Sequence, residues 1–203
     1  MPVIDIIIVY GGILFGVNRM LKFTDIKYLP VIDASTGRKI GFVKDVLIVP
    51  ATKEIKGFII SCKNLLYYFK AIKIEHIITI GKHAVLIKDI KYLISLKHFF
   101  LKVGEVKRYS DVFIEKQVYT DGGEKIGSIQ DALFDFETAT LAEFEISDGL
   151  IQDLIEGRRV IEAKEIIQLE KGIVMLGREK LKQLKQKHKG LKNLLGERKG
   201  KNE

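Results

Sequence analysis

The sequence predicts an all-β protein made of two tandem copies of one small β-barrel module, on three observations. Residues 22–62 align with residues 108–148 without a gap, and 11 of the 41 pairs are identical, whereas average composition would give about two or three. Each copy contains short runs rich in β-branched residues, separated by turn residues every ~8–12 positions. Glycines inside these runs are typical of the bends that close a small sheet.

Each copy begins with a short helical turn. Phe23-Thr24-Asp25-Ile26 and Tyr109-Ser110-Asp111-Val112 place a hydroxyl residue before an acid, which predicts a helix cap in which the hydroxyl accepts a backbone N–H. An apolar run then leads to a turn at residues 33–37 in the first copy and at residues 121–123 in the second. Gly and Asp tolerate positive φ, so both turns are predicted to join hairpin strands.

The remaining elements follow in the same order in both copies. A long strand is predicted from residue 40 to residue 49, and the next turn precedes strands at 55–61 and 141–147. Later strands are predicted at 66–73 and 84–87 in the first copy and at 153–161 and 173–176 in the second. One helical turn lies between each later pair, at 75–78 and 164–167. Here the offset between copies grows from 86 to 89.

Six residues present in both copies are predicted to serve the turns and bends of the fold. They are Gly37, Gly41, Asp45, Gly123, Gly127 and Asp131. The acidic series Asp131, Asp135, Glu137 occurs in one copy only, so we interpret it as a solvated strand face rather than a cation site.

The repeat divides the chain into five segments. Residues 1–21 are an apolar segment, 22–87 the first module, 88–107 a linker, 108–177 the second module and 178–203 a basic tail. The linker is too apolar for a free tether, so we expect the modules to touch.

The function of the apolar N-terminal segment has two interpretations. As a helix, residues 3–17 would span about 22 Å, less than the ~30 Å of a hydrocarbon core. The segment is either a single membrane anchor, with Arg19 and Lys22 on the cytoplasmic side, or upstream sequence read from a misassigned start codon. A chain that began at Met20 would begin where the module begins.

Composition argues against catalysis. Cys62 is the only cysteine, so no internal disulfide can form and a reducing, cytoplasmic location is expected. The four histidines are far apart and none has metal-ligand spacing to Cys or acids. No nucleophile–base motif and no phosphate loop is present. We therefore expect a non-enzymatic protein with no cofactor and no metal.

The net charge of +8 comes mainly from the tail, because residues 178–203 contain ten Lys or Arg and three Glu. The tail is predicted to form a short helix interrupted by Gly190 and Gly196, with Leu181, Leu184, Leu191 and Leu195 near one face. Its candidate partner-binding residues are Lys180, Lys182, Lys185, Lys187, Lys189 and Lys192. Such a segment suits RNA phosphates or an anionic membrane surface, or only improves solubility.

The two modules resemble the PRC-barrel family, which includes the cytoplasmic part of the photosynthetic reaction centre H subunit and the C-terminal half of the ribosome maturation factor. In the first copy the resemblance is carried by Gly37, Lys39-Ile40-Gly41, Val43, Asp45, Leu47 and Phe58. In the second copy it is carried by Gly123, Lys125-Ile126-Gly127, Ile129, Asp131, Leu133 and Phe144. The resemblance implies a small β-barrel that acts as an interaction or assembly module.

The sequence therefore predicts a cytoplasmic binding or assembly adaptor whose partner is a protein or a ribonucleoprotein. The alternative is a protein associated with the cytoplasmic face of a membrane, through the tail or through the N-terminal segment.

Overall fold

The computed structural model describes residues 6–10, 13–17, 20–62, 68–149, 158–168, 173–177 and 185–186. The chain forms two compact units, each of which is described by itself. The first unit comprises Met1–Asp111 and Phe134–Leu141, and the second comprises Val112–Leu133 and Ala142–Glu203.

The N-terminal segment contains two short strands. β1 (Ile6–Tyr10) and β2 (Ile13–Val17) pair antiparallel as a two-stranded sheet. The part of this segment that the structure describes is thus extended, not helical. Within the described residues, no helix reaches the length and apolarity that crossing a membrane requires.

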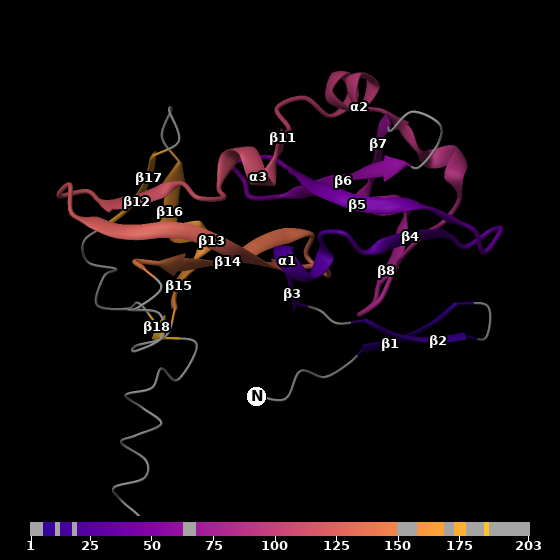
Figure 1. Cartoon of the computed structure of the whole chain (residues 1–203), viewed down its shortest axis with the longest axis horizontal. Helices are drawn as coiled ribbons and strands as arrows, with labels where there is room; N and C mark the ends of the chain where they lie inside the picture. The colour runs from indigo at the N-terminus through magenta and orange to yellow at the C-terminus, as the bar shows by residue number, and fades with distance from the viewer. Residues whose placement is uncertain are drawn as a thin grey trace, which may run out of the picture. The chain divides into compact units, whose positions relative to one another are not determined.

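The first copy forms one sheet with the strand order β10-β7-β6-β5-β4-β9-β8. Figure 1 labels β4, β5, β6, β7 and β8 of this sheet. Its strands are β4 (Pro30–Asp33), β5 (Lys39–Ile48), β6 (Ile55–Cys62), β7 (Tyr68–Lys73), β8 (Ile77–Ile80), β9 (Val85–Ile87) and β10 (Ile94–Ser95). β4 and β9 pair in parallel and the other neighbours pair antiparallel. Short β3 (Met20–Lys22) and α1 (Phe23–Ile26) precede this sheet, and η1 (Ile74–His76) and η2 (Ile90–Tyr92) connect its later strands.

The second copy repeats this order strand for strand, as β18-β15-β14-β13-β12-β17-β16. Its strands are β12 (Gln117–Thr120), β13 (Lys125–Asp135), β14 (Thr140–Ser147), β15 (Arg159–Glu162), β16 (Ile166–Gln168), β17 (Ile173–Leu176) and β18 (Lys185–Gln186), with η3 (Ala163–Glu165) before β16. The chain is therefore an all-β protein with two equivalent sheets, as the sequence predicts.

The long strands β5 and β13 carry the same β-bulge. In the first copy Val31 pairs with Gly41 and Ile32 pairs with Lys39, so Ile40 is the extra residue. In the second copy the same shift makes Ile126 the extra residue. β5 contains another bulge at Lys44, because Val43 pairs with Ile60 and Asp45 with Ile59. Bulges of this kind bend a strand sharply.

The linker between the copies is folded. α2 (Leu96–Val103) follows β10 directly, its first turn is capped by the Ser95 side chain, and Gly104 ends it with φ of 82°. The apolar side of α2 covers the outer face of β5, β6 and β7, where Leu47, Ile59 and Ala71 pack with Phe99 and Val106. This packing hides Phe99 completely from solvent.

The boundary between the units does not coincide with the boundary between the copies. β11 (Lys107–Arg108) pairs with β5, and α3 (Tyr109–Val112) follows it. Tyr109 is fully buried, with its ring 4.7 Å from that of Phe23 and 5.3 Å from that of Phe134. The turn between β13 and β14 is also hydrogen-bonded to a strand of the first copy: the Ile55 N–H in β6 donates to the Ala139 carbonyl at 2.7 Å. The first unit is thus completed by two segments of the second copy.

Thr24 does not occupy the cap position of α1, so the cap prediction was wrong for the first copy. α1 starts at Phe23, two residues earlier than a Thr24 cap requires, and its Lys22 cap position makes no side-chain hydrogen bond. The Ser110 hydroxyl instead donates to the Asp45 carboxylate. A carboxylate is a strong hydrogen-bond acceptor, which favours this contact of the Ser110 hydroxyl.

Candidate functional site

The repeated glycines lie where backbone geometry restricts side chains. Gly37 and Gly123 have φ of 69° and 80°, in the left-handed region of the hairpin turns. Gly41 and Gly127 lie in the long strands, where a Cβ would come within 2.1 Å of the Ser61 carbonyl oxygen and 2.3 Å of the Ser147 carbonyl oxygen. The backbone carbonyls cannot yield that space cheaply, so these positions serve the close approach of strands.

Asp45 and Asp131 are buried carboxylates that bind neighbouring backbone. Asp45 Oδ1 accepts the Val46 N–H at 2.8 Å and the Ser110 N–H at 3.3 Å, and Asp131 Oδ1 accepts the Ala132 N–H at 2.8 Å. Burial raises the pKa of Asp45, although the hydrogen bonds from Ser110 and Val46 oppose this effect. These contacts hold together elements of the fold.

The predicted tail residues cannot be placed in the same way. Lys180, Lys182, Lys187, Lys189 and Lys192 lie outside the described residues, and Lys185 is described only as part of the backbone of β18. Asp135, from the acidic series, accepts the Glu137 N–H at 2.9 Å in the turn after β13. In the part of the chain that the structure describes, no three potential ligands gather to hold a metal ion.

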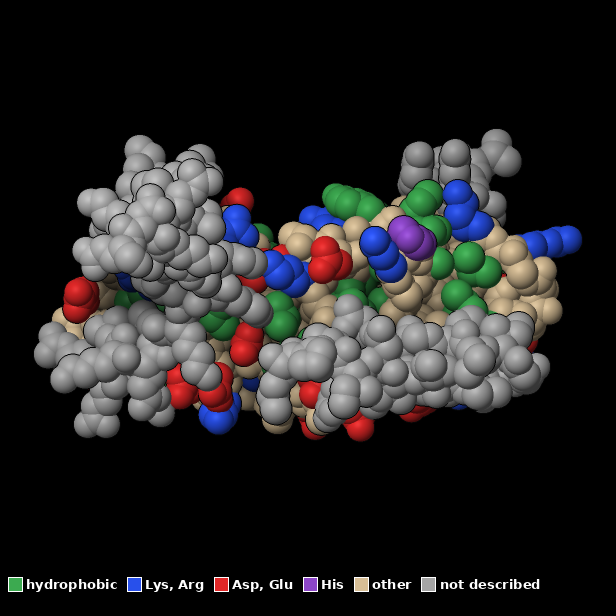
Figure 2. Space-filling model, turned by 90° about the horizontal axis from the view of Figure 1, so that it is seen from below, with side chains coloured by type: hydrophobic (Ala, Val, Ile, Leu, Met, Phe, Trp, Pro, Cys, Tyr) green, Lys and Arg blue, Asp and Glu red, His purple; other side chains and the backbone are tan. Residues whose placement is uncertain are grey.

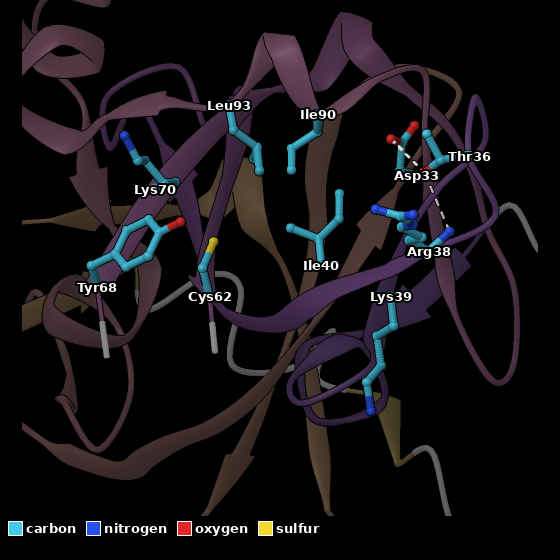
Figure 3. A pocket seen from close by; sticks show the side chains of 10 residues that line it. All are labelled: Asp33, Thr36, Arg38, Lys39, Ile40, Cys62, Tyr68, Lys70, Ile90 and Leu93. Carbon is cyan, nitrogen blue, oxygen red and sulfur yellow. Dashed lines mark hydrogen bonds between the residues drawn. The ribbon is translucent and has the colours of Figure 1, made fainter. Parts of the chain in front are cut away.

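The first unit has a hollow of about 360 Å³ at the bulged end of β5 (Figure 3). Ile40, Ile90 and Leu93 point toward its middle. The remaining lining residues are polar and come from both sides: Asp33, Thr36, Arg38, Lys39, Cys62, Tyr68 and Lys70. The hollow thus combines an apolar floor with a polar rim.

Two groups that line this hollow, Asp33 and Cys62, have shifted pKa values. Burial alone would raise the pKa of Asp33, but hydrogen bonds donated by Ser35 and Thr36 outweigh it and hold the pKa below its ordinary value. Burial raises the pKa of the Cys62 thiol despite nearby Lys70, so the reactive thiolate is disfavoured. Asp33 is engaged by its turn, and Cys62 is a buried core thiol.

A second feature of the first unit lies on the opposite side of the same strands, where cations stand over aromatic rings. Lys27 Nζ and Lys44 Nζ lie 5.2 Å and 5.8 Å from the ring centroid of Tyr28. Lys39 Nζ lies 4.8 Å from that of Phe42, and Figure 3 shows Lys39 directed away from the hollow. We call this surface the basic–aromatic face: Lys27, Tyr28, Lys39, Phe42, Lys44 and Phe69.

The backbone presents this face to solvent. Tyr28 is 61% exposed and has φ of 71°, an uncommon conformation for a bulky residue. Phe42 pairs with Ser61, which pairs with Phe69, so these side chains share one face of the sheet. Phe69 is 43% exposed. In the space-filling view, lysine and arginine side chains on the right-hand half likewise lie among hydrophobic ones (Figure 2).

The second copy lacks this surface at the equivalent positions. Matching hydrogen bonds, from Tyr28 N–H to Val43 and from Glu115 N–H to Ile129, show that Tyr28 corresponds to Glu115, one residue away from the gapless alignment. The counterparts of Lys27, Tyr28, Lys39, Phe42 and Lys44 are Ile114, Glu115, Lys125, Ser128 and Gln130. Beside Ser128, the counterpart of Phe42, the second unit has a polar hollow of about 520 Å³, which is lined by Gln117, Ser128 and Gln130 among others.

The sequence contained part of the signal for the basic–aromatic face. Phe42 with Ser128 and Lys44 with Gln130 are mismatches within the aligned segment, but their common exposure could not be read from the pattern. The gapless alignment pairs Tyr28 with Ile114, whereas its structural counterpart is Glu115. The alignment therefore could not show which residue of the second copy replaces Tyr28.

Comparison with known families agrees with the repeat. The family model of the PRC-barrel domain matches twice, at residues 18–94 and 104–181. No curated protein matches the chain.

Proposed function

Because this chain belongs to the PRC-barrel family, with two such domains in tandem, we propose that it is a non-enzymatic assembly adaptor for a ribonucleoprotein and that the basic–aromatic face binds single-stranded RNA. PRC-barrel domains serve binding and assembly and are generally not catalysts. The observation that carries the proposal is the pair of lysines over the exposed Tyr28 ring, on a face that the second copy does not share.

The charges of this face suit a phosphate backbone. Lys27, Lys39 and Lys44 each lie within 6 Å of an aromatic ring centroid, and such contacts hold a cation in place by roughly 0.5–1 kcal/mol at exposed sites. Lysines that are held in place lose less side-chain entropy when they meet a phosphate. Three phosphate contacts on a single strand predict that log K falls with log salt with a slope of about −2.

The rings of this face suit unstacked bases. Tyr28 and Phe69 are both exposed large aromatic side chains, and stacking of a base on an aromatic ring contributes about 1–3 kcal/mol without sequence preference. The combination of fixed cations and exposed rings therefore favours a single strand over a duplex, whose bases are not accessible to the rings.

The test is the binding of the full chain to a fluorescein-labelled 20-nucleotide oligouridine, measured by anisotropy at several salt concentrations. Tyr28→Asn removes the ring, and Asn tolerates the positive φ, so the fold is retained while Kd rises about 5- to 150-fold. Tyr28→Phe keeps the ring and should bind like wild type. Changing Phe42→Ser together with Lys44→Gln gives the first copy the residues of the second and should lower the salt slope by about 0.7.

Lys91→Gln is the matched control, because Lys91 Nζ also stands over a ring, that of Tyr92 at 5.3 Å, but outside the basic–aromatic face. It should leave Kd within about 2-fold. If Lys91→Gln and Phe42→Ser/Lys44→Gln lose equal affinity for oligouridine, the attraction of the RNA to the lysines is non-specific and the proposal is overturned. If the chain binds an acidic peptide and does not bind oligouridine, the partner of the basic–aromatic face is a protein and the RNA proposal is wrong.

A further inference from the structure

The hollow at the bulged end of β5 has an apolar floor that is open to solvent. Ile40 is the extra residue of the bulge, Ile90 begins η2, and Leu93 follows η2 directly. Figure 3 shows these three side chains directed toward the middle of the hollow. Ile90 is 53% exposed, and Tyr68 at one side of the hollow is 40% exposed. Exposed apolar surface within a concave site is typical of a place where a ligand binds.

The Asp33 carboxylate joins two walls of this hollow. It accepts hydrogen bonds from the hydroxyls of Ser35 and Thr36, at 2.7 Å and 2.9 Å, and from the Ile90 N–H. The turn after β4 and the start of η2 are therefore tied to one buried side chain. The Leu93 N–H donates to the Ile90 carbonyl at 3.0 Å, which closes η2. A pocket whose walls are already held loses less conformational entropy when a ligand enters it.

The charges around the hollow suit an anion. Arg38 and Lys70 lie on opposite sides of it (Figure 3), and Arg38 makes no ion pair among the residues that the structure describes. Among the described lining residues, Asp33 is the one carboxylate, and its oxygens already accept hydrogen bonds. The Tyr68 hydroxyl is directed toward the hollow (Figure 3) and can donate a hydrogen bond. A guanidinium binds a carboxylate through two parallel hydrogen bonds, so Arg38 favours a carboxylate as the anion.

The second copy differs at the positions equivalent to the cation and to the open floor. In the gapless alignment Glu124 replaces Arg38. Both residues close the same hairpin turn, because their carbonyls accept the N–H of the last residue of β4 and of β12, at 2.9 Å and 2.8 Å. Ile126, the extra residue of the second bulge, is 3% exposed, whereas Ile40 is only half-buried. The turn therefore accepts either charge, and the cation beside an open apolar floor is a feature of the first copy.

We infer that the hollow of the first unit binds a small carboxylic acid with an apolar body, whose carboxylate meets Arg38 and whose hydrocarbon lies on the apolar floor. Its volume of about 360 Å³ lies within the ~300–1,000 Å³ of ordinary small-molecule sites, so it accommodates one small ligand. The hollow and the basic–aromatic face lie on opposite sides of the same strands. The inference therefore does not depend on RNA binding.

Titration of the full-length chain with 4-phenylbutyrate, followed by NMR of the isoleucine methyl groups, tests the inference. The Ile40 and Ile90 methyl resonances should shift with one common Kd, while that of Ile126 in the second copy stays in place. The alcohol 4-phenylbutan-1-ol has the same apolar body without the charge, and it should bind about 10-fold more weakly or worse. Arg38→Glu introduces the residue of the second copy and should raise the Kd for 4-phenylbutyrate at least ~10-fold. Lys97→Gln is the matched control, because Lys97 is an exposed cation on α2, and it should leave Kd within about 2-fold.

Three results would overturn the inference: equal affinities for the acid and the alcohol, unshifted Ile40 and Ile90 resonances at saturating 4-phenylbutyrate, or equal losses of affinity in Arg38→Glu and Lys97→Gln. A short peptide that ends in Leu with a free carboxylate carries the same chemistry on a protein chain. If this peptide binds at least ~10-fold more tightly than 4-phenylbutyrate, the hollow receives a chain terminus and the small-molecule assignment is wrong. Tyr28→Asn should leave the Kd for 4-phenylbutyrate within about 2-fold, so a failure of the RNA proposal is distinguishable from a failure of this one.

Discussion

Replacing Phe134 by Ala should destabilise the first unit, although Phe134 belongs to the second copy of the repeat. The Phe134 side chain is fully buried, and its ring lies 5.3 Å from Tyr109 and 6.4 Å from Phe23, with edge-to-face geometry in both pairs. All three residues belong to the first unit. The variant therefore leaves a cavity beside Phe23 and Tyr109, in the core of the first unit.

The size of the effect follows from the volume that is lost. Truncation of a buried Phe to Ala costs about 3–5 kcal/mol, which is a large part of the ~5–15 kcal/mol that stabilises a typical domain. A loss of this size should speed the exchange of β6 amides by about two to four orders of magnitude. Peptides that cover Ile55–Cys62 report on this strand in a hydrogen-exchange experiment with mass detection.

Phe144→Ala provides the matched control. Phe144 is also fully buried, and its ring lies 4.7 Å from that of Phe113, within the second unit. This change should speed exchange in peptides from residues 142–147. If Phe134→Ala leaves β6 exchange at the wild-type rate, the assignment of residues 134–141 to the first unit is wrong.

Two other changes test the roles of the repeated residues. Gly41→Ala should destabilise the protein by more than ~3 kcal/mol, because the new Cβ would lie 2.1 Å from the Ser61 carbonyl oxygen. Gly81→Ala, whose nearest contact is 3.6 Å, should change the urea midpoint little, and equal midpoints for the two variants would contradict the close approach. Burial raises the pKa of Asp45 in the folded protein. The contribution of this carboxyl to the free energy of unfolding is therefore fully present below its unfolded pKa of about 3.9, and it is lost as pH rises through its folded pKa. The Asn side chain of Asp45→Asn cannot ionise. The urea midpoint of this variant relative to that of wild type should therefore be higher at pH 7 than at pH 4, and an equal difference at the two pH values would refute this reasoning.

Much of the fold could be predicted because strand and turn signals are local. The strand-like run from residue 40 corresponds to β5, and the predicted helical turns correspond to η1 and η3 within one or two residues. Periodicity and turn chemistry act between near neighbours in sequence, so a single chain reveals them. The strand signal of β18 was missed because two residues that pair with a distant edge carry no periodicity.

The candidate site depended on contacts that a sequence does not contain. The lysines of the tail lie close together in the sequence, whereas the lysines of the basic–aromatic face come from the end of α1 and from two positions of β5. These residues meet only when β4 lies beside β5 with its bulges in place. Bulge positions depend on how strands register, and small offsets there move a side chain from one face of the sheet to the other.

The sequence by itself determined that this protein is a tandem of one all-β module, because the duplication and the runs of β-branched residues between turns can be read directly from the chain. Only the tertiary structure decided which segments complete each unit. Tyr109 and Phe134 are ordinary apolar residues in the second copy, and nothing nearby in sequence distinguishes them from residues that pack in their own copy. Burial of apolar surface is non-directional, so it acts on whatever side chains the strand pairing brings together.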